Sequence, residues 1–172
     1  MAGEQLGVGE PPVDKHHRIV FAADYGVETP LHYRGPYLPE SFGLSPDLCL
    51  QLESWASLFD HAVGDDAVRP WKHGFDSERY ENEGDQLARC VADELGSRWA
   101  VQRRRAWAPD SESIWIRSTE PGSREGAESA AEPIAERAKQ QEERLRAIRD
   151  RGGKLDIAPR NGRSALPPRS GS

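Results

Sequence analysis

Residues 45–62 are SPDLCLQLESWASLFDHA, and they predict an amphipathic helix. Ser45 is a favourable N-cap residue, Pro46 suits the first helical position, and Asp47 complements the positive end of the helix dipole. Apolar residues then recur at spacings of four and three, at Leu48, Leu52, Trp55, Phe59 and Ala62. One apolar stripe follows from this spacing, so we expect the helix to cover a sheet or another helix.

A second helix is predicted over residues 76–96, with Asp76 as N-cap and Gly96 at its end. Its apolar stripe is made of Tyr80, Gly84, Leu87, Val91 and Leu95. A glycine inside a helix costs about 1 kcal/mol against alanine. Because Gly84 lies on the apolar face, we expect another element to approach the helix closely there.

Strand-like segments flank the two helices. They are RIVFAADY at 18–25, a short edge segment at 31–33, WAVQRRRAW at 99–107 and SIWIR at 113–117. The order β-α-α-β-β predicts a small two-layer sandwich of the α+β or α/β class, with three or four strands covered by two helices. The connection through both helices is long enough for either a parallel crossover or an antiparallel return.

Aromatic residues define the expected domain boundaries. All 13 lie between Phe21 and Trp115 of the 172 residues, so the two ends have few large side chains to bury. We therefore expect a flexible leader at 1–17, a folded α/β domain at 18–117 and a linker at 118–131. An amphipathic helix at 132–151 and a disordered basic tail at 152–172, rich in Pro, Arg and Ser, would follow.

The expected helix at 132–151 has a narrow apolar seam. Its members are Ile134, Ala138, Gln141, Leu145 and Ile148, which form two heptads with one polar residue. Two heptads are marginally stable alone. The segment is therefore either a partly ordered exposed helix or a short coiled-coil element that orders on binding, in cis or in trans.

Charge and hydropathy limit the function classes. Residues 1–117 carry a net charge of −8 and residues 118–172 a net charge of +2, which disfavours a nucleic-acid partner without excluding a local basic patch. No apolar run approaches the length of a membrane helix, and the first ten residues do not resemble a secretory signal. We expect a cytoplasmic protein without membrane contact, in which Cys49 and Cys90 are reduced, buried thiols.

The layout of residues 18–107 resembles that of a known group of sequences. The shared features are RIVFAADYG, LSPDL-x3-L-x2-W-x3-F, an RPW loop, and E-G-x2-LA-x6-LG before a strand. They are similar to small uncharacterised proteins of high-GC bacterial genomes, chiefly actinobacterial. No assigned activity accompanies this resemblance, so it implies an α/β fold and no functional residues.

The loop after the first helix contains the best candidates for catalysis. His61, Asp65 and His73 could hold a divalent metal or act as an acid–base pair. Their spacing matches no established metal motif, and aspartates at helix ends are common caps. A solvated loop is the simpler interpretation. We find no cofactor motif and expect no cofactor.

Arginine and tryptophan residues near position 103 are the best candidates for binding. If the strand runs over 99–107, Trp99, Arg103, Arg105 and Trp107 share one of its faces. They could bind an acidic partner or, with the tail, a nucleic acid; internal ion pairing of the arginines is the alternative. Trp71 either pins its loop to the core or stacks on a ligand.

The leading hypothesis is a non-enzymatic interaction module: an adaptor, a regulator or a neutraliser of a protein partner. A metal-dependent or acid–base enzyme centred on residues 60–76, and a nucleic-acid-associated protein using Arg103–Arg105, are the alternatives.

Overall fold

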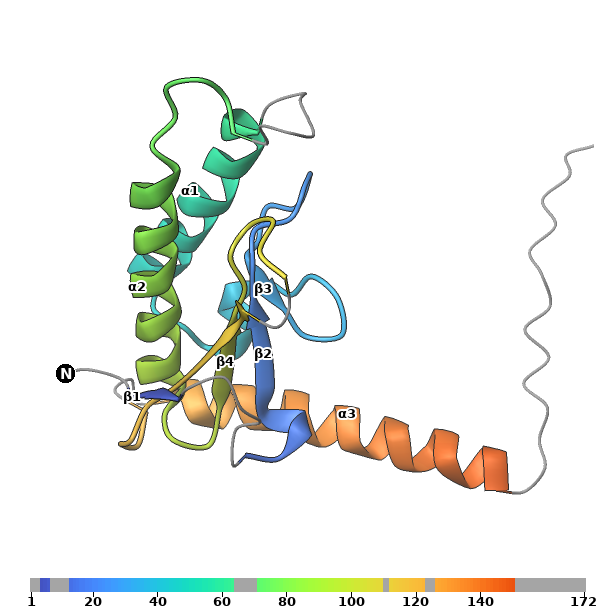
Figure 1. The fold of residues 1–172 in the computed structure, drawn as a ribbon. Coiled ribbons are helices and arrows are strands. Elements are labelled where there is room, and N and C mark those ends of the chain that lie inside the picture. Colours follow the sequence, from blue (N-terminus) through green and yellow to red (C-terminus); the bar gives the residue numbers. More distant parts are fainter. Residues whose placement is uncertain (1–3, 7–12, 64–70, 110–111, 123–125, 151–172) are drawn as a thin grey trace, which may run out of the picture. The chain divides into compact units, whose positions relative to one another are not determined.

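A computed structural model describes residues 4–6, 13–63, 71–109, 112–122 and 126–150 of the chain, and Figure 1 shows its fold. The described residues form one five-stranded mixed sheet in the order β1-β5-β4-β2-β3, together with three α-helices. The predicted class, a small mixed α/β sandwich, is confirmed, but the sheet has one strand more than the three or four expected, because β1 joins it. The predicted tail at 152–172 lies outside the described residues.

The centre of the sheet is a parallel pair. β2 (Arg18–Phe21) pairs in parallel with β4 (Ala100–Arg103), and Ile19 lies opposite Val101. The long connection through the two helices is therefore a parallel crossover, which settles the alternative that the sequence left open. Both faces of β2 are covered or partly covered, as its run of apolar residues requires.

Three short antiparallel strands complete the sheet. β3 (Leu31–His32) is the predicted edge strand beside β2, and β5 (Ile114–Arg117) pairs with β4. β1 (Glu4–Leu6) pairs with β5 and lies within the segment that we expected to be a flexible leader. A 3-10 turn, η1 (Lys15–His17), follows in the same segment, and the side chain of Asp14 caps it.

The two predicted helices pack together beside the sheet (Figure 1). α1 (Pro46–Ala62) begins at Ser45, whose hydroxyl accepts a hydrogen bond from the Leu48 amide, and a second 3-10 turn, η2 (Pro39–Phe42), precedes it. α2 (Ser77–Leu95) begins at Asp76 and is followed by Gly96, as its sequence predicts. The largest fully buried side chains are Trp55, Trp99, Arg103, Phe21 and Phe42.

α3 (Ala127–Asp150) begins five residues earlier than the expected helix. Its first half buries Ala127, Ala131, Ile134, Ala135 and Ala138 in the main core. Glu132 contacts Arg98 and His17, which lie two residues before β4 and one residue before β2. Small side chains thus attach this half to the folded unit, although it has no aromatic residue.

The second half of α3, from Gln140, belongs to a separate unit. Leu145 and Ile148 of the expected seam are exposed there by 40% and 44%.

Cys49 is buried, but Cys90 is exposed on α2, which corrects the expectation of two buried thiols. Within the described residues, no helix is long and apolar enough to cross a membrane.

Candidate protein-binding face

The parallel pairing of β2 and β4 brings two chain segments together at one edge of the sheet. The last residues of the two strands, Phe21 and Arg103, lie opposite each other, and the Arg104 amide continues the pairing by donating to the Phe21 carbonyl at 2.9 Å. Residues 22–25 and 104–108 therefore leave the sheet side by side. The crevice outside the carboxyl ends of parallel strands is the usual place for binding sites in α/β sheets.

Trp107 is the most prominent side chain at this edge. It remains 52% exposed, although one side of its ring stacks on Phe59 at 5.4 Å and its edge meets Trp71 at 4.6 Å. Its φ of +57° is a left-handed conformation that bulky residues rarely adopt. Such a conformation persists only where the surroundings impose it, so the fold fixes the backbone that carries this half-exposed ring.

A hollow lies on each side of Trp107. One, of about 420 Å³, is lined by residues 22–25 and 104–108 above Phe59 and Val63. The other, of about 430 Å³, lies towards Trp71, Glu81 and Pro109. We call the surface formed by residues 22–25 and 104–108 the Trp107 face. Its exposed members include Tyr25 at 69%, Trp107 at 52%, the side chain of Arg105 at 51%, and Asp24.

Aromatic side chains, among them Trp71, Phe75, Tyr80 and Trp55, pack between the Trp107 face and the core. Trp71 is half-buried and stacks on Phe75 at 5.1 Å, so it pins its loop to the core, one of the two roles considered for it. Tyr80 stacks on Trp55 at 4.5 Å, and the Trp55 indole donates to the Tyr80 carbonyl at 3.0 Å. Burial raises the pKa of the Tyr80 hydroxyl well above its ordinary value.

The expected face of alternating Trp and Arg residues does not form. β4 ends at Arg103, and both Trp99 and Arg103 are fully buried, at 0% and 1% exposure, so neither can meet a partner directly. Arg103 forms ion pairs with Glu81 and Asp85 of α2, which is the internal pairing that we considered as the alternative. Only Arg105 and Trp107 of the four reach the surface.

Arg105 is the exposed end of this ion-pair network. Its guanidinium donates to Asp85 at 2.6 Å, and this hydrogen bond raises the pKa of Arg105. Because its charge is matched by Asp85, and because Arg103 is buried, the row Arg103–Arg105 does not present the exposed basic stripe that a phosphate backbone requires.

The structure places two of the three candidate catalytic residues, His61 and His73, at the surface. His61 is exposed at the end of α1, where its ring nitrogen contacts the Ser57 carbonyl at 2.8 Å, and His73 is exposed in the loop before α2. Asp65 lies outside the described residues. The part of the chain that the structure describes holds no group of three or more metal-ligating side chains.

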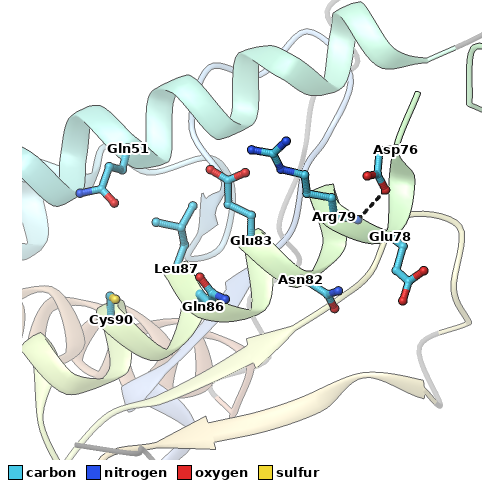
Figure 2. Close-up of a pocket in the computed structure, with 9 residues that line it drawn as sticks. All are labelled: Gln51, Asp76, Glu78, Arg79, Asn82, Glu83, Gln86, Leu87 and Cys90. Atoms are coloured by element: carbon cyan, nitrogen blue, oxygen red, sulfur yellow. Dashed lines mark hydrogen bonds between the residues drawn. The ribbon is translucent and has the colours of Figure 1, made fainter. Parts of the chain in front are cut away.

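A third hollow, apart from the Trp107 face, lies along α2, with Gln51 of α1 at its border (Figure 2). It measures about 600 Å³, and its charged members are Asp76, Glu78, Glu83 and Arg79. Figure 2 shows Glu83 and Arg79 between the ribbons of α1 and α2, and the Asp76 carboxylate accepts a hydrogen bond from the Arg79 amide. An enclosed apolar cavity with a few polar groups is typical of small-molecule sites, so this open acidic surface does not favour one.

Sequence reasoning missed three residues that shape the site. The sequence places Tyr25 in the first strand, whereas β2 ends at Phe21. Glu81 and Asp85 are charged residues within a helix and, by sequence alone, do not differ from solvent-exposed positions of α2. Their spacing of four, on either side of the Gly84 stripe position, is the only sequence signal that they could face a buried cation.

The fold and this site define a class: a small α/β protein whose exposed aromatic face is suited to contact with another macromolecule. The chain belongs to the Serratia CdiI immunity protein-like family, whose sequence profile matches residues 17–105. The matched residues run from the start of β2 to the middle of the Trp107 face, and they nearly coincide with the layout at 18–107 noted in the sequence. No curated protein matches the chain.

Proposed function

We propose that this chain neutralises a partner toxin by binding it, and that the Trp107 face makes the principal contact. Membership of an immunity protein-like family supports the general part of the proposal, a protein partner. The specific part of the proposal, the choice of the Trp107 face, is supported by Trp107 itself, a half-exposed tryptophan that borders two hollows.

The composition of the face supports a protein contact. Tryptophan, tyrosine and arginine dominate the energetic centres of protein interfaces, and the face exposes one of each, Trp107, Tyr25 and Arg105. The hollows on both sides offer places for a partner's side chains. Because the ring is already fixed by Phe59 and Trp71, binding does not have to order it, and this lowers the entropic cost of association.

The experiment begins with site-directed photocrosslinking in cells that produce the protein. A benzophenone amino acid replaces Tyr25, which is aromatic and 69% exposed, and the control carries it at Leu50, which is 65% exposed. Leu50 lies on α1 about two and a half helical turns before Phe59, outside the face. A protein that is crosslinked from position 25 and not from position 50 is taken forward.

The second step tests neutralisation itself. The crosslinked protein is expressed in a growth assay with and without this chain, and with the Trp107→Ala and Leu50→Ala variants. We expect it to arrest growth and the wild-type chain and Leu50→Ala to restore growth. Trp107→Ala is expected to raise the dissociation constant about 30-fold or more, the effect of losing a central interface tryptophan.

Two results would contradict the proposal, each in a different part. If the crosslinked protein is harmless, or if the chain does not relieve its toxicity, toxin neutralisation is wrong. If Trp107→Ala binds and protects as well as the wild type, neutralisation stands but the assigned face is wrong.

We also propose that the second half of α3 adds a contact that orders on binding. Leu145 and Ile148 are exposed on successive turns and have the spacing of a helix-pairing seam. A chain ending at Lys139 is expected to keep its fold and to bind the partner more weakly. Equal affinity of the shortened and complete chains for the crosslinked protein would remove this contact from the proposal.

A further inference from the structure

The segment that carries Trp107 is held from beneath by buried charges of α2. The backbone amide of Ala106 donates to the Glu81 carboxylate at 3.0 Å, and the Arg103 guanidinium donates to the Arg104 carbonyl. Glu81 and Arg103 are themselves ion-paired. Two of the peptide groups just before Trp107 are thus held by one charged pair.

The pair is nearly dry and has little freedom. The side chain of Arg103 is 1% exposed and that of Glu81 is 12% exposed. The Arg103 guanidinium lies over the rings of Trp55 at 5.3 Å and Phe21 at 5.5 Å, and its Nε is 3.1 Å from Asp85. The guanidinium is therefore held between two carboxylates, those of Glu81 and Asp85, and the Arg104 carbonyl, and hydrogen bonds with a charged member are the strongest available in such a place.

From these contacts we infer that Glu81 and Arg103 are positioning residues for the Trp107 face. They do not touch a partner. Glu81 fixes the amide of Ala106, Arg103 fixes the carbonyl of Arg104, and together they hold the backbone in the turn that gives Trp107 its φ of +57°. The use of the face rests on the proposed function, whereas the positioning itself does not.

Amide hydrogen exchange tests the inference on the protein alone. Glu81→Ala removes the acceptor of the Ala106 amide, and we expect the exchange rate of that amide to rise about tenfold or more, since a hydrogen bond to a charged group is lost. The signal of the Trp107 indole in 5-fluorotryptophan NMR, assigned with Trp107→Phe, should move and sharpen as the ring becomes mobile. Core amides of β4, such as that of Val101, should change less than the Ala106 amide.

A conservative variant separates positioning from general support. Glu81→Gln keeps the size of the side chain and an oxygen that can accept from Ala106, so it should restore most of the protection that Glu81→Ala loses. Glu83→Ala, an exposed carboxylate of the same helix, is the matched control and should leave both signals unchanged.

Three outcomes would overturn the inference. The Ala106 amide could exchange in Glu81→Ala as in the wild type, the Trp107 signal could stay in place, or exchange could accelerate equally throughout β4. If Glu81→Ala does not fold, the test uses Glu81→Gln. If the Ala106 amide and the β4 amides then lose protection to the same extent, the role of Glu81 is purely structural. Each readout is independent of a toxin. The inference can therefore hold where neutralisation fails, and neutralisation can hold where the inference fails.

Discussion

Gly84 offers the sharpest test of how α2 meets the sheet. A methyl group placed at its Cβ position would lie 2.5 Å from Cζ2 of Trp55 and 2.6 Å from Nη2 of Arg103. Carbon atoms pack favourably at about 3.5–4.0 Å, so these side chains would have to move by about 1 Å. Both are fully buried, and Trp55 is further held by its hydrogen bond to the Tyr80 carbonyl.

Two opposing effects set the magnitude for Gly84→Ala. The alanine gains about 1 kcal/mol of helix propensity. Overpacking a filled core costs about 1–3 kcal/mol, and the upper part of that range applies because neither neighbour can withdraw to solvent. The expected result is a net loss of about 2 kcal/mol in the free energy of unfolding, or about 6–10 °C in Tm for a domain of this size.

Chemical denaturation in urea, followed by near-UV circular dichroism, measures this loss. Asn82→Ala is the matched control, because Asn82 is exposed on the same helix and its replacement changes helix propensity alone. We expect the control to stay within about 0.5 kcal/mol of the wild type. If Gly84→Ala is instead more stable than the wild type, α2 does not approach Trp55 and Arg103 as closely as described.

Two further expectations concern the core. The Tyr80 hydroxyl has no hydrogen-bond partner among the described residues, so Tyr80→Phe should lie within about 1 kcal/mol of the wild type at pH 7. Burial keeps the folded-state pKa of Tyr80 above 10.0, so the unfolded chain loses a proton that the folded chain retains, and the free energy of unfolding should fall as the pH rises through 10. Tyr80→Phe should make this fall shallower and leave the contributions of Tyr33 and Cys90, whose pKa values burial also raises. An unchanged slope in alkaline unfolding curves would contradict the assignment. Ile134→Ala should cost about 2–4 kcal/mol, because Ile134 is only 6% exposed. Leu145→Ala, at 40% exposure on the same helix, should cost less than about 1 kcal/mol, and equal losses in thermal melts would show that the first half of α3 is not part of the core.

The sequence predicts the helices well because their signals are local. Ser45, Asp76 and Gly96 mark helix ends by their own chemistry, and the apolar stripes follow from spacing alone. The start of α3 at 127–131 and the burial of its first half escape the same reasoning, since alanines such as Ala131 bury little area each and resemble linker residues. The helix also approaches its neighbours closely: a Cβ added at Gly43 would lie 2.7 Å from the Cβ of Ala130 and 3.2 Å from the Cα of the buried Ala127.

The candidate site is harder to predict because its geometry arises between distant segments. The alternation of Trp99, Arg103 and Trp107 predicts one strand face, but the strand ends at Arg103, and Trp107 leaves it in a left-handed turn. Whether an arginine points inward depends on carboxylates that another element supplies, here Glu81 and Asp85 of α2. Periodicity in one segment holds no information about such partners.

The buried charges beneath the Trp107 face are themselves an argument for its use. Replacing a buried ion-pair network with apolar residues of similar volume is often neutral or stabilising by about 1–4 kcal/mol, so stability alone does not account for Arg103, Glu81 and Asp85 in this core. What apolar side chains cannot do is hold the Ala106 amide and the Arg104 carbonyl in fixed directions. Fixing the backbone just before an exposed tryptophan is a role that this network can fill and apolar residues cannot. The same reasoning predicts that an apolar triple replacement would fold stably and yet present Trp107 loosely to its partner.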